Sequence, residues 1–184
     1  MRKLVGTSAV LAFLGSAAMA TGLEIEVAGE ANGTVKIDLL EDVAPAHVTQ
    51  ITELAEEGAY DGVVFHRVID GFMAQTGDVQ FGRADGDTAR AGMGGSDKPD
   101  LEAEFSDIAY EKGVVGMARS QSPNSANSQF FIMFDEAPFL DGQYTVVGKV
   151  TEGQDVVDAI KRGTGPNGAV VGTPDVMQKV TVTE

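Results

Sequence analysis

Short apolar runs separated by glycine-containing turns constrain the fold of this chain more than any other feature. Glycine accounts for 23 of the 184 residues, and most of it falls between these runs. Glycine suits tight turns and weakens long helices, so the pattern favours many short strands. Apolar and polar residues alternate in several of the runs, as they do in half-buried strands. The predicted strands are residues 23–27, 34–39, two within 65–77, 113–118, 129–134, 144–150 and 176–182.

Two segments have helical rather than strand spacing. The first follows Pro45, a residue suited to the first turn of a helix, and ends at Gly58. The second is a short helix around residues 156–160 that stops at Gly163. Short strands with two helices predict a closed antiparallel β-barrel capped by the helices. A β-sandwich is the alternative, because periodicity does not separate the two.

Composition excludes several classes of function. The chain has no cysteine, which excludes disulfides, thiolate metal sites and a cysteine nucleophile. It carries 13 basic and 28 acidic residues, a net charge of −15. A polyanion of this size repels nucleic acid and anionic lipid, so neither is an expected partner. With 43% hydrophobic residues, the chain has enough apolar side chains to form a core by packing alone.

The first twenty residues have the order of a secretory signal peptide. A basic start at Arg2 and Lys3 is followed by an apolar run over 4–15 and by the small-residue site Ala18-Met19-Ala20. The run is shorter than the about 20 apolar residues of a membrane span, although an uncleaved anchor is the alternative. We therefore expect residues 1–20 to direct export to the periplasm, without stable membrane insertion, and residues 21–184 to form one domain.

Two polar side chains stand out in the apolar stretch of residues 65–77. Arg67 and Gln75 lie among large apolar residues, and a half-buried arginine is costly unless a partner binds it. The stretch therefore predicts a binding surface with a few placed hydrogen-bond donors, unless the arginine only reaches solvent. The only histidines are His47, expected on a solvated helix face, and His66, expected as a structural hydrogen bonder. They are too few for a zinc site in a chain without cysteine, so no metal is expected.

Four motifs in this order resemble the cyclophilins, a family of peptidyl-prolyl cis/trans isomerases. The motifs are FHRVIDGFMAQTGD, GVVGMARS, NSQFFIMF and FLDGQYTVVGKV. The resemblance runs from Leu23 to the last predicted strand. It implies a closed eight-stranded antiparallel β-barrel capped by two α-helices. It also implies an enzyme that acts on X–Pro bonds of proline-containing polypeptides as a monomer, without a cofactor.

The resemblance also implies a set of site residues. Arg67 takes the place of the catalytic arginine, and Gln75 that of an amide that orients the substrate. The proline pocket is formed by Phe72, Met73, Phe131 and Leu140. The peptide groove is bordered by Ala118, Arg119, Gln129, Phe139 and Tyr144. Each aromatic residue of this set, taken alone, is more often a core residue than part of a binding wall.

Three positions depart from the best-known eukaryotic members of the family. Phe139 replaces a tryptophan, and Tyr144 replaces a histidine. The missing indole N–H implies that cyclosporin binds only weakly, while the proline pocket is kept. Arg119 replaces an asparagine whose main chain makes the contact. Two other functions are compatible with the same groove or fold: a peptide-binding chaperone and a barrel that carries a small ligand.

Overall fold

A computed structural model describes residues 21–184 as a mainly β, antiparallel structure. The predicted signal peptide, residues 1–20, lies outside the described residues. The strands are β1 (Gly22–Ala28), β2 (Gly33–Leu39), β3 (Val63–Val64), β4 (Arg67–Ile69), β5 (Met73–Thr76), β6 (Val114–Met117), β7 (Phe130–Met133), β8 (Val146–Glu152) and β9 (Val176–Thr183). The helices are α1 (Pro45–Glu56) and α2 (Gln154–Ala159), with 3-10 turns η1 (Thr88–Arg90), η2 (Pro138–Leu140) and η3 (Pro166–Gly168).

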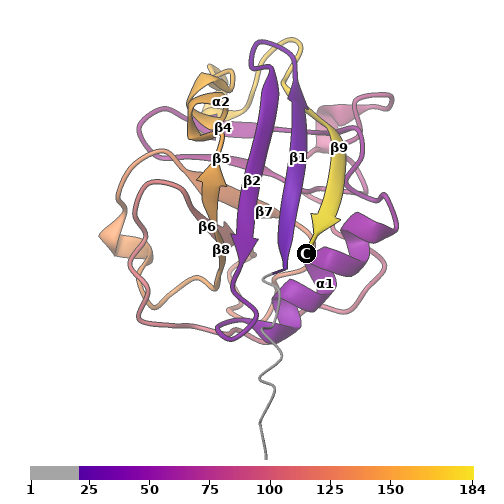
Figure 1. Ribbon diagram of the computed structural model, residues 1–184. Helices are drawn as coiled ribbons and strands as arrows, with labels where there is room; N and C mark the ends of the chain where they lie inside the picture. The colour runs from indigo at the N-terminus through magenta and orange to yellow at the C-terminus, as the bar shows by residue number, and fades with distance from the viewer. Residues whose placement is uncertain (1–20) are drawn as a thin grey trace, which may run out of the picture.

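The nine strands of the described residues form one curled sheet in the order β3-β9-β1-β2-β8-β6-β7-β5-β4. Figure 1 shows β1, β2 and β9 side by side, with β4, β5 and β7 crossing behind them, so that the sheet forms a half-barrel. Helix α1 packs near β9, and α2 lies near β2 at the other end of the sheet (Figure 1). None of the helices in residues 21–184 has the length and apolar character needed to cross a membrane.

The predicted closed eight-stranded barrel is wrong in strand number and in closure. The edge strands β3 and β4 belong to one extended segment, separated only by Phe65 and His66. The first half of this segment pairs with β9 and the second half with β5. Two consecutive pieces of one strand-like segment meet end to end, so no ladder of hydrogen bonds joins them sideways. The hydrogen-bonded sheet therefore does not close into a barrel, although Phe65 and His66 connect its two edge strands through the chain.

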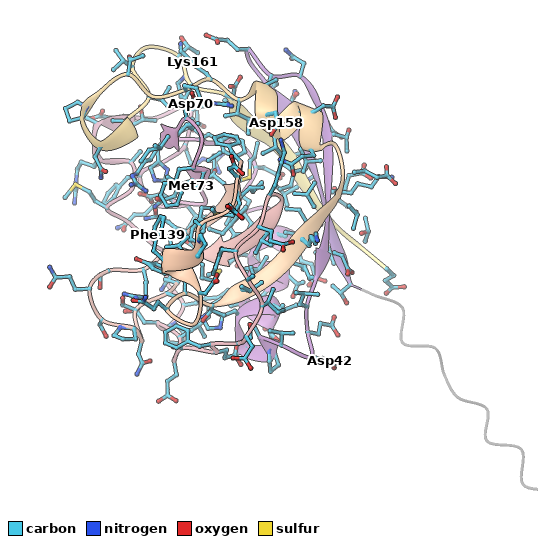
Figure 2. All side chains as sticks on the ribbon, turned by 90° about the vertical axis from the view of Figure 1, so that its left-hand side faces the viewer. Asp42, Asp70, Met73, Phe139, Asp158 and Lys161 are labelled. Carbon is cyan, nitrogen blue, oxygen red and sulfur yellow. The ribbon has the colours of Figure 1, made fainter. Side chains whose placement is uncertain are left out.

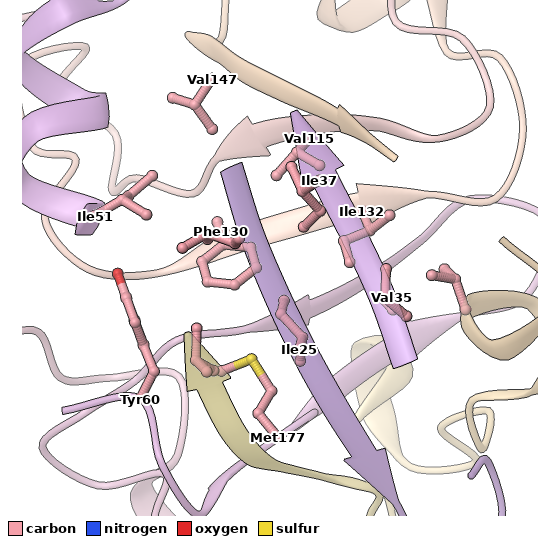
Figure 3. Packing of buried hydrophobic residues seen from close by; sticks show 14 of the residues in the cluster. Ile25, Val35, Ile37, Ile51, Tyr60, Val115, Phe130, Ile132, Val147 and Met177 are labelled. Carbon is pink, nitrogen blue, oxygen red and sulfur yellow. The ribbon is translucent and has the colours of Figure 1, made fainter. Parts of the chain in front are cut away.

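A large apolar cluster fills the inside of the curled sheet. Figure 3 shows Ile25, Val35 and Ile37 from β1 and β2 pointing toward Phe130 and Ile132 of β7, with all five side chains buried. Helix α1 closes one end of this cluster with its buried face, which comprises Val48, Ile51, Leu54 and Ala55. The apolar periodicity that predicted the helix is therefore the periodicity of its contact with the sheet.

Strand β7 is buried on both faces, and this arrangement creates the floor of a second cluster. Phe130 and Ile132 point into the main core, whereas Phe131 and Met133 point to the opposite face. Successive side chains of a strand alternate between faces, so one short apolar run supplies two layers. The second cluster also contains Met73 and lies outside the half-barrel.

The prediction that His47 lies on a solvated face of the helix is wrong. His47, near the N-terminus of α1, is completely buried. Its Nδ1 lies 2.6 Å from Oε2 of Glu104. The two oxygens of this carboxylate also accept the backbone N–H groups of Ala46 and His47, at 3.2 and 3.1 Å. Residue Ala44 at the N-cap position has no side-chain acceptor, so Glu104 provides the cap from a distant loop.

Candidate active site

A cavity of about 410 Å³ lies on the outer face of the half-barrel, above the second apolar cluster. Strands β4 and β5, the end of β6, strand β7 and the segment around η2 contribute its walls. Figure 2 faces this side of the molecule and labels Met73 and Phe139. The lining residues are Arg67, Phe72, Met73, Gln75, Ala118, Arg119, Phe131, Phe139, Leu140, Gln143 and Tyr144. The structure thus brings together every predicted site residue except Gln129.

Apolar side chains form the floor and one rim of the cavity. Met73, Phe131 and Leu140 are 1, 5 and 6% exposed, so they present a fixed apolar floor. Phe72 and Phe139 stand at the rim with ring centroids 5.5 Å apart, and Phe139 is 65% exposed. The three residues of the floor belong both to the cavity and to the core, because the cavity lies directly on the second buried cluster. Its shape and chemistry suit a small apolar ring.

Arg67 and Gln75 face each other across the β4–β5 ladder, where their backbones are direct register partners. Arg67 Nη1 donates to Gln75 Oε1 at 3.1 Å. The tight turn at Gly71, which has a φ of 66°, sets this register and places the two side chains on the cavity face. The pairing of these two polar residues is therefore a consequence of hairpin geometry.

A residue that the sequence prediction missed holds the other side of Arg67. The backbone oxygen of Asn167 accepts from Arg67 Nε at 3.0 Å, and its Oδ1 accepts from Nη2 at 3.1 Å. The dipeptide Asn167-Gly168 is a strong turn signal that could have marked this segment, but nothing local relates it to an arginine 100 positions earlier. Gln143 at the cavity wall was also missed, although it precedes Tyr144 within the motif FLDGQYTVVGKV.

A directed chain of amide hydrogen bonds continues from Gln75 to a neighbouring loop. Gln75 Nε2 donates to Gln129 Oε1 at 2.9 Å, and Gln129 Nε2 donates to the backbone oxygen of Gly94 at 2.8 Å. The guanidinium at one end only donates and the carbonyl at the other only accepts, so each amide has one consistent orientation. We call Arg67, Gln75, Gln129 and the Gly94 carbonyl the amide relay.

Gln129 borders a second hollow, of about 400 Å³, that adjoins the apolar cavity and shares Gln75, Ala118 and Arg119 with it. Residues 92–96, in the long segment between β5 and β6, form one side of this polar hollow. The fully buried carboxylate of Asp78 holds this loop, because its Oδ2 accepts the N–H groups of Gly92 and Gly94 at 2.7 and 2.9 Å.

The Arg119 side chain contributes to the wall in addition to its main chain. Its Nη2 donates to the backbone oxygen of Gln143 at 2.9 Å, and its guanidinium carbon lies 4.3 Å from the centroid of the Tyr144 ring. The Tyr144 ring in turn contacts Phe131 edge-on, with centroids 6.0 Å apart. Arg119 therefore ties the loop after β6 to the segment before β8, across the site.

The electrostatics of the site are dominated by an arginine without an acidic partner. No carboxylate of residues 21–184 forms an ion pair with Arg67. Partial burial lowers the pKa of this guanidinium, which nevertheless remains charged near neutral pH. The cavity thus presents the positive donor Arg67 above an apolar floor, with a second arginine, Arg119, in its wall. Within the described residues no group of histidine and acidic side chains is placed to hold a metal ion.

The neighbouring His66 corrects a further prediction. Neither of its ring nitrogens has a hydrogen-bond partner among residues 21–184, whereas the sequence suggested a structural hydrogen bonder. Burial lowers the pKa of His66 to about 4, so the ring is neutral at physiological pH. A neutral His66 adds no second charge beside Arg67.

Comparison with known proteins identifies the family. A family model described as cyclophilin type peptidyl-prolyl cis-trans isomerase/CLD matches residues 23–183. A probable peptidyl-prolyl cis-trans isomerase of Brucella suis biovar 1 (strain 1330) is 61% identical over 153 residues, which cover 82% of this chain and 78% of the relative. The crystal structure of cyclophilin AquaCyp293 from Hirschia baltica aligns with a TM-score of 0.70 and 28% identity, covering 87% of this chain and 73% of that one. A Cryptosporidium parvum cyclophilin type isomerase, solved in the presence of the dipeptide Ala-Pro, has the same fold, with a TM-score of 0.73, 23% identity and coverage of 89% and 99%.

Proposed function

Because this chain belongs to the cyclophilin-type peptidyl-prolyl cis-trans isomerases, we propose that Arg67 and the apolar cavity beside it catalyse rotation about X–Pro bonds of exported polypeptides. Gln75 orients Arg67 and the substrate backbone in this proposal. Phe72, Met73, Phe131 and Leu140 hold the proline ring. The observation that carries the proposal is a guanidinium that has no carboxylate partner among the described residues 21–184 and lies at the edge of a closely packed apolar floor.

The chemistry requires no covalent step. Rotation about a peptide bond costs ~18–20 kcal/mol because amide resonance must be broken. X–Pro bonds are the ones with an appreciable cis population, and they interconvert in tens of seconds or longer. No bond forms or breaks, so the reaction needs neither a nucleophile nor a cofactor. An enzyme has only to bind the twisted imide more tightly than either planar form.

The cavity provides this preference in two ways. The planar amide is the more dipolar form, so an apolar site such as the floor of Met73, Phe131 and Leu140 disfavours it relative to the twisted state. In the twisted state the proline nitrogen regains a lone pair, and Arg67 can donate a charge-assisted hydrogen bond to it. The proline ring stays fixed on the floor while the preceding carbonyl turns.

The magnitudes show that Arg67 does not act alone. A rate gain of about 10⁵ corresponds to roughly 7 kcal/mol, at about 1.36 kcal/mol per decade. One hydrogen bond to a charged group supplies on the order of 1.5–3 kcal/mol. Desolvation of the imide and fixation of the proline ring must supply the remainder. We therefore expect substitution of Arg67 to remove part of the acceleration rather than all of it.

The substrate class we propose is a flexible, proline-containing segment of a protein outside the cytoplasm. Support comes from the continuity of the apolar cavity with the polar hollow, which gives an extended groove for residues next to the proline. The Cryptosporidium relative was crystallised in the presence of Ala-Pro, which is consistent with this class. The signal-like order of residues 1–20 supports a periplasmic location, which fractionation of cells followed by immunodetection would test.

A protease-coupled assay on a short proline peptide tests the catalytic role. We expect Arg67→Ala to lower kcat/KM by about 10- to 100-fold, the equivalent of one charged hydrogen bond. Arg90→Ala is the matched control, because Arg90 forms no ion pair within residues 21–184, stacks on Phe81 and lies outside both cavities. An Arg67→Ala protein as active as the control would refute the role of Arg67.

The extended groove also favours a second candidate, a peptide-binding chaperone in which turnover is incidental. Arg67→Ala separates the two functions, because it spares the apolar floor. If this variant suppresses aggregation of a proline-rich client as well as the wild type does, and also replaces it in cells, binding rather than catalysis is the function that matters there.

A further inference from the structure

The segment of residues 163–170 lies along the outer edge of β4, the strand that carries Arg67. The N–H of Gly163 donates to the oxygen of Val68 at 2.8 Å, and the N–H of Val170 donates to the oxygen of His66 at 3.0 Å. An edge strand would otherwise present these carbonyls to solvent or to another chain. The segment covers the edge and, in doing so, brings its turn against the side chain of Arg67.

The turn itself is an Asn-Gly turn with both central residues left-handed. Asn167 has a φ of 54° and Gly168 a φ of 77°, and the N–H of Ala169 donates to the oxygen of Pro166 at 3.1 Å. These are the features of a type I′ turn. Gly168 is required here, because a Cβ would lie 2.3 Å from Cγ1 of Ile69. Asn167 is the only non-glycine residue of the described chain with a positive φ.

The acceptors around Arg67 are all neutral. The oxygen and Oδ1 of Asn167 accept from Nε and Nη2, and Oε1 of Gln75 accepts from Nη1. Three of the five N–H bonds of the guanidinium are thereby directed at oxygen acceptors, and Nη1 also lies 3.9 Å from the sulfur of Met73, a weak acceptor that a ligand can displace. A glycine at position 167 would keep the turn but lose one acceptor. An aspartate would keep the acceptor but cancel the charge.

We propose that Asn167 is a positioning residue for the isomerase reaction, which orients the Arg67 guanidinium without neutralising it. This inference rests on the role of Arg67 given under Proposed function. Asn167 does not line the cavity, so it does not touch the proline ring. It acts on the donor that stabilises the twisted imide and leaves binding of the planar substrate unchanged.

Two substitutions separate positioning from a purely structural role. Asn167→Gly removes Oδ1, keeps the backbone acceptor and suits the left-handed backbone, so the protein should melt no lower than the wild type. Asn167 is exposed and water competes for Nη2, so we expect kcat to fall only about three- to tenfold, with KM within about twofold. Asn167→Asp places a carboxylate on Arg67, and we expect a larger fall in kcat than for the glycine variant.

The experiment measures kcat, KM and the thermal midpoint for both variants, with Asn32→Gly and Arg67→Ala as references. Asn32 lies in the β1–β2 turn, where its Nδ2 donates to Gly29 at 2.7 Å, and it contributes to neither cavity. The expected order of kcat is wild type and Asn32→Gly, then Asn167→Gly, then Asn167→Asp. If both Asn167 variants keep the wild-type kcat while Arg67→Ala loses activity, Asn167 has no positioning role. If Arg67→Ala also keeps full activity, the role of Arg67 fails and this inference fails with it.

Discussion

Replacing Gln75 by glutamate tests whether the amide relay serves to hold Arg67 without offsetting its charge. Glutamate has nearly the shape of glutamine and keeps an acceptor for Arg67 Nη1, which in the wild type lies 3.1 Å from Gln75 Oε1. It cannot donate to Gln129, so the 2.9 Å bond between the two amides is lost. The carboxylate also forms an ion pair with Arg67 in a half-buried setting. The new charge, rather than a change of shape, is the main perturbation.

The expected size of the effect follows from these contacts. Gln75→Leu removes one acceptor of a charged donor but leaves the charge. A hydrogen bond to a charged group contributes about 1.5–3 kcal/mol, and we expect a loss near the lower end of this range, which is a fall in kcat/KM of about tenfold. Gln75→Glu pairs the still-protonated guanidinium with a carboxylate that offsets its charge toward the substrate, which costs about the whole charged hydrogen bond, or roughly 100-fold. The near-isosteric variant should therefore be the poorer enzyme.

The protease-coupled assay, run on both variants and on Gln178→Glu, decides the question. Gln178 is exposed on β9, far along the sheet order from β5, so its substitution adds the same charge without touching the site. Equal or higher activity of Gln75→Glu relative to Gln75→Leu would show that the relay contributes shape alone, and our electrostatic argument would be wrong. Thermal midpoints of all three variants, measured alongside, test whether unfolding causes any loss of activity.

Further predictions concern the walls of the cavity and the stability of the fold. Arg119→Lys keeps the charge but loses the directed bond to Gln143 and the stacking on the tyrosine ring, so KM should rise about threefold in the same assay while kcat stays within twofold. Glu104→Gln should lower the free energy of unfolding by about 1–3 kcal/mol at neutral pH in urea titrations, because the charged acceptor at His47 is lost. Burial alone would raise the pKa of Glu104, but the hydrogen bonds from His47 and two backbone N–H groups outweigh it and lower the pKa. The stabilisation from Glu104 should therefore be complete above the unfolded-state pKa of about 4.3 and disappear as the pH falls through the lowered folded-state pKa. The Glu104→Gln protein should not show this loss of stability. Phe139→Trp places the first tryptophan of the chain at the cavity rim, and its fluorescence should report peptide binding and a gain in cyclosporin affinity; an unchanged affinity would argue against the importance of the indole donor.

The local pattern of the sequence predicts the elements of this fold well, and for identifiable reasons. The strand predictions rest on alternation and on glycine turns, which depend on neighbouring residues only. Closure of the sheet depends on long-range pairing, and here the expectation of a closed barrel failed. The segment that was expected to begin a simple hairpin at Phe65 also supplies β3 two residues earlier, so one segment belongs to both edges of the sheet.

The candidate site shows the same division between local and distant information. The family motifs place Arg67 and Gln75 on one hairpin, where their pairing follows from register. The acceptors on the far side of Arg67 come from a turn 100 positions later, and the cap on His47 comes from a carboxylate 57 positions later. The residue types alone do not predict either contact, because an asparagine in a turn and a glutamate in a loop are usually exposed to solvent.

The two arginines that line the cavity have neutral partners, although Arg90, outside the cavity, also forms no ion pair within residues 21–184. Carboxylates are abundant in this acidic chain, and Arg162 shows the usual outcome: it binds Asp70 at 2.9 Å and stacks on Phe134. Arg67 and Arg119, which line the cavity, find amide and backbone oxygens instead, and neither forms an ion pair within residues 21–184. Neutral acceptors hold a guanidinium less strongly than a carboxylate does, but they leave its charge available to a ligand. In a chain whose acidic side chains outnumber basic ones by more than two to one, neutral partners for both cavity arginines are consistent with the proposed catalysis, in which Arg67 donates to an uncharged imide.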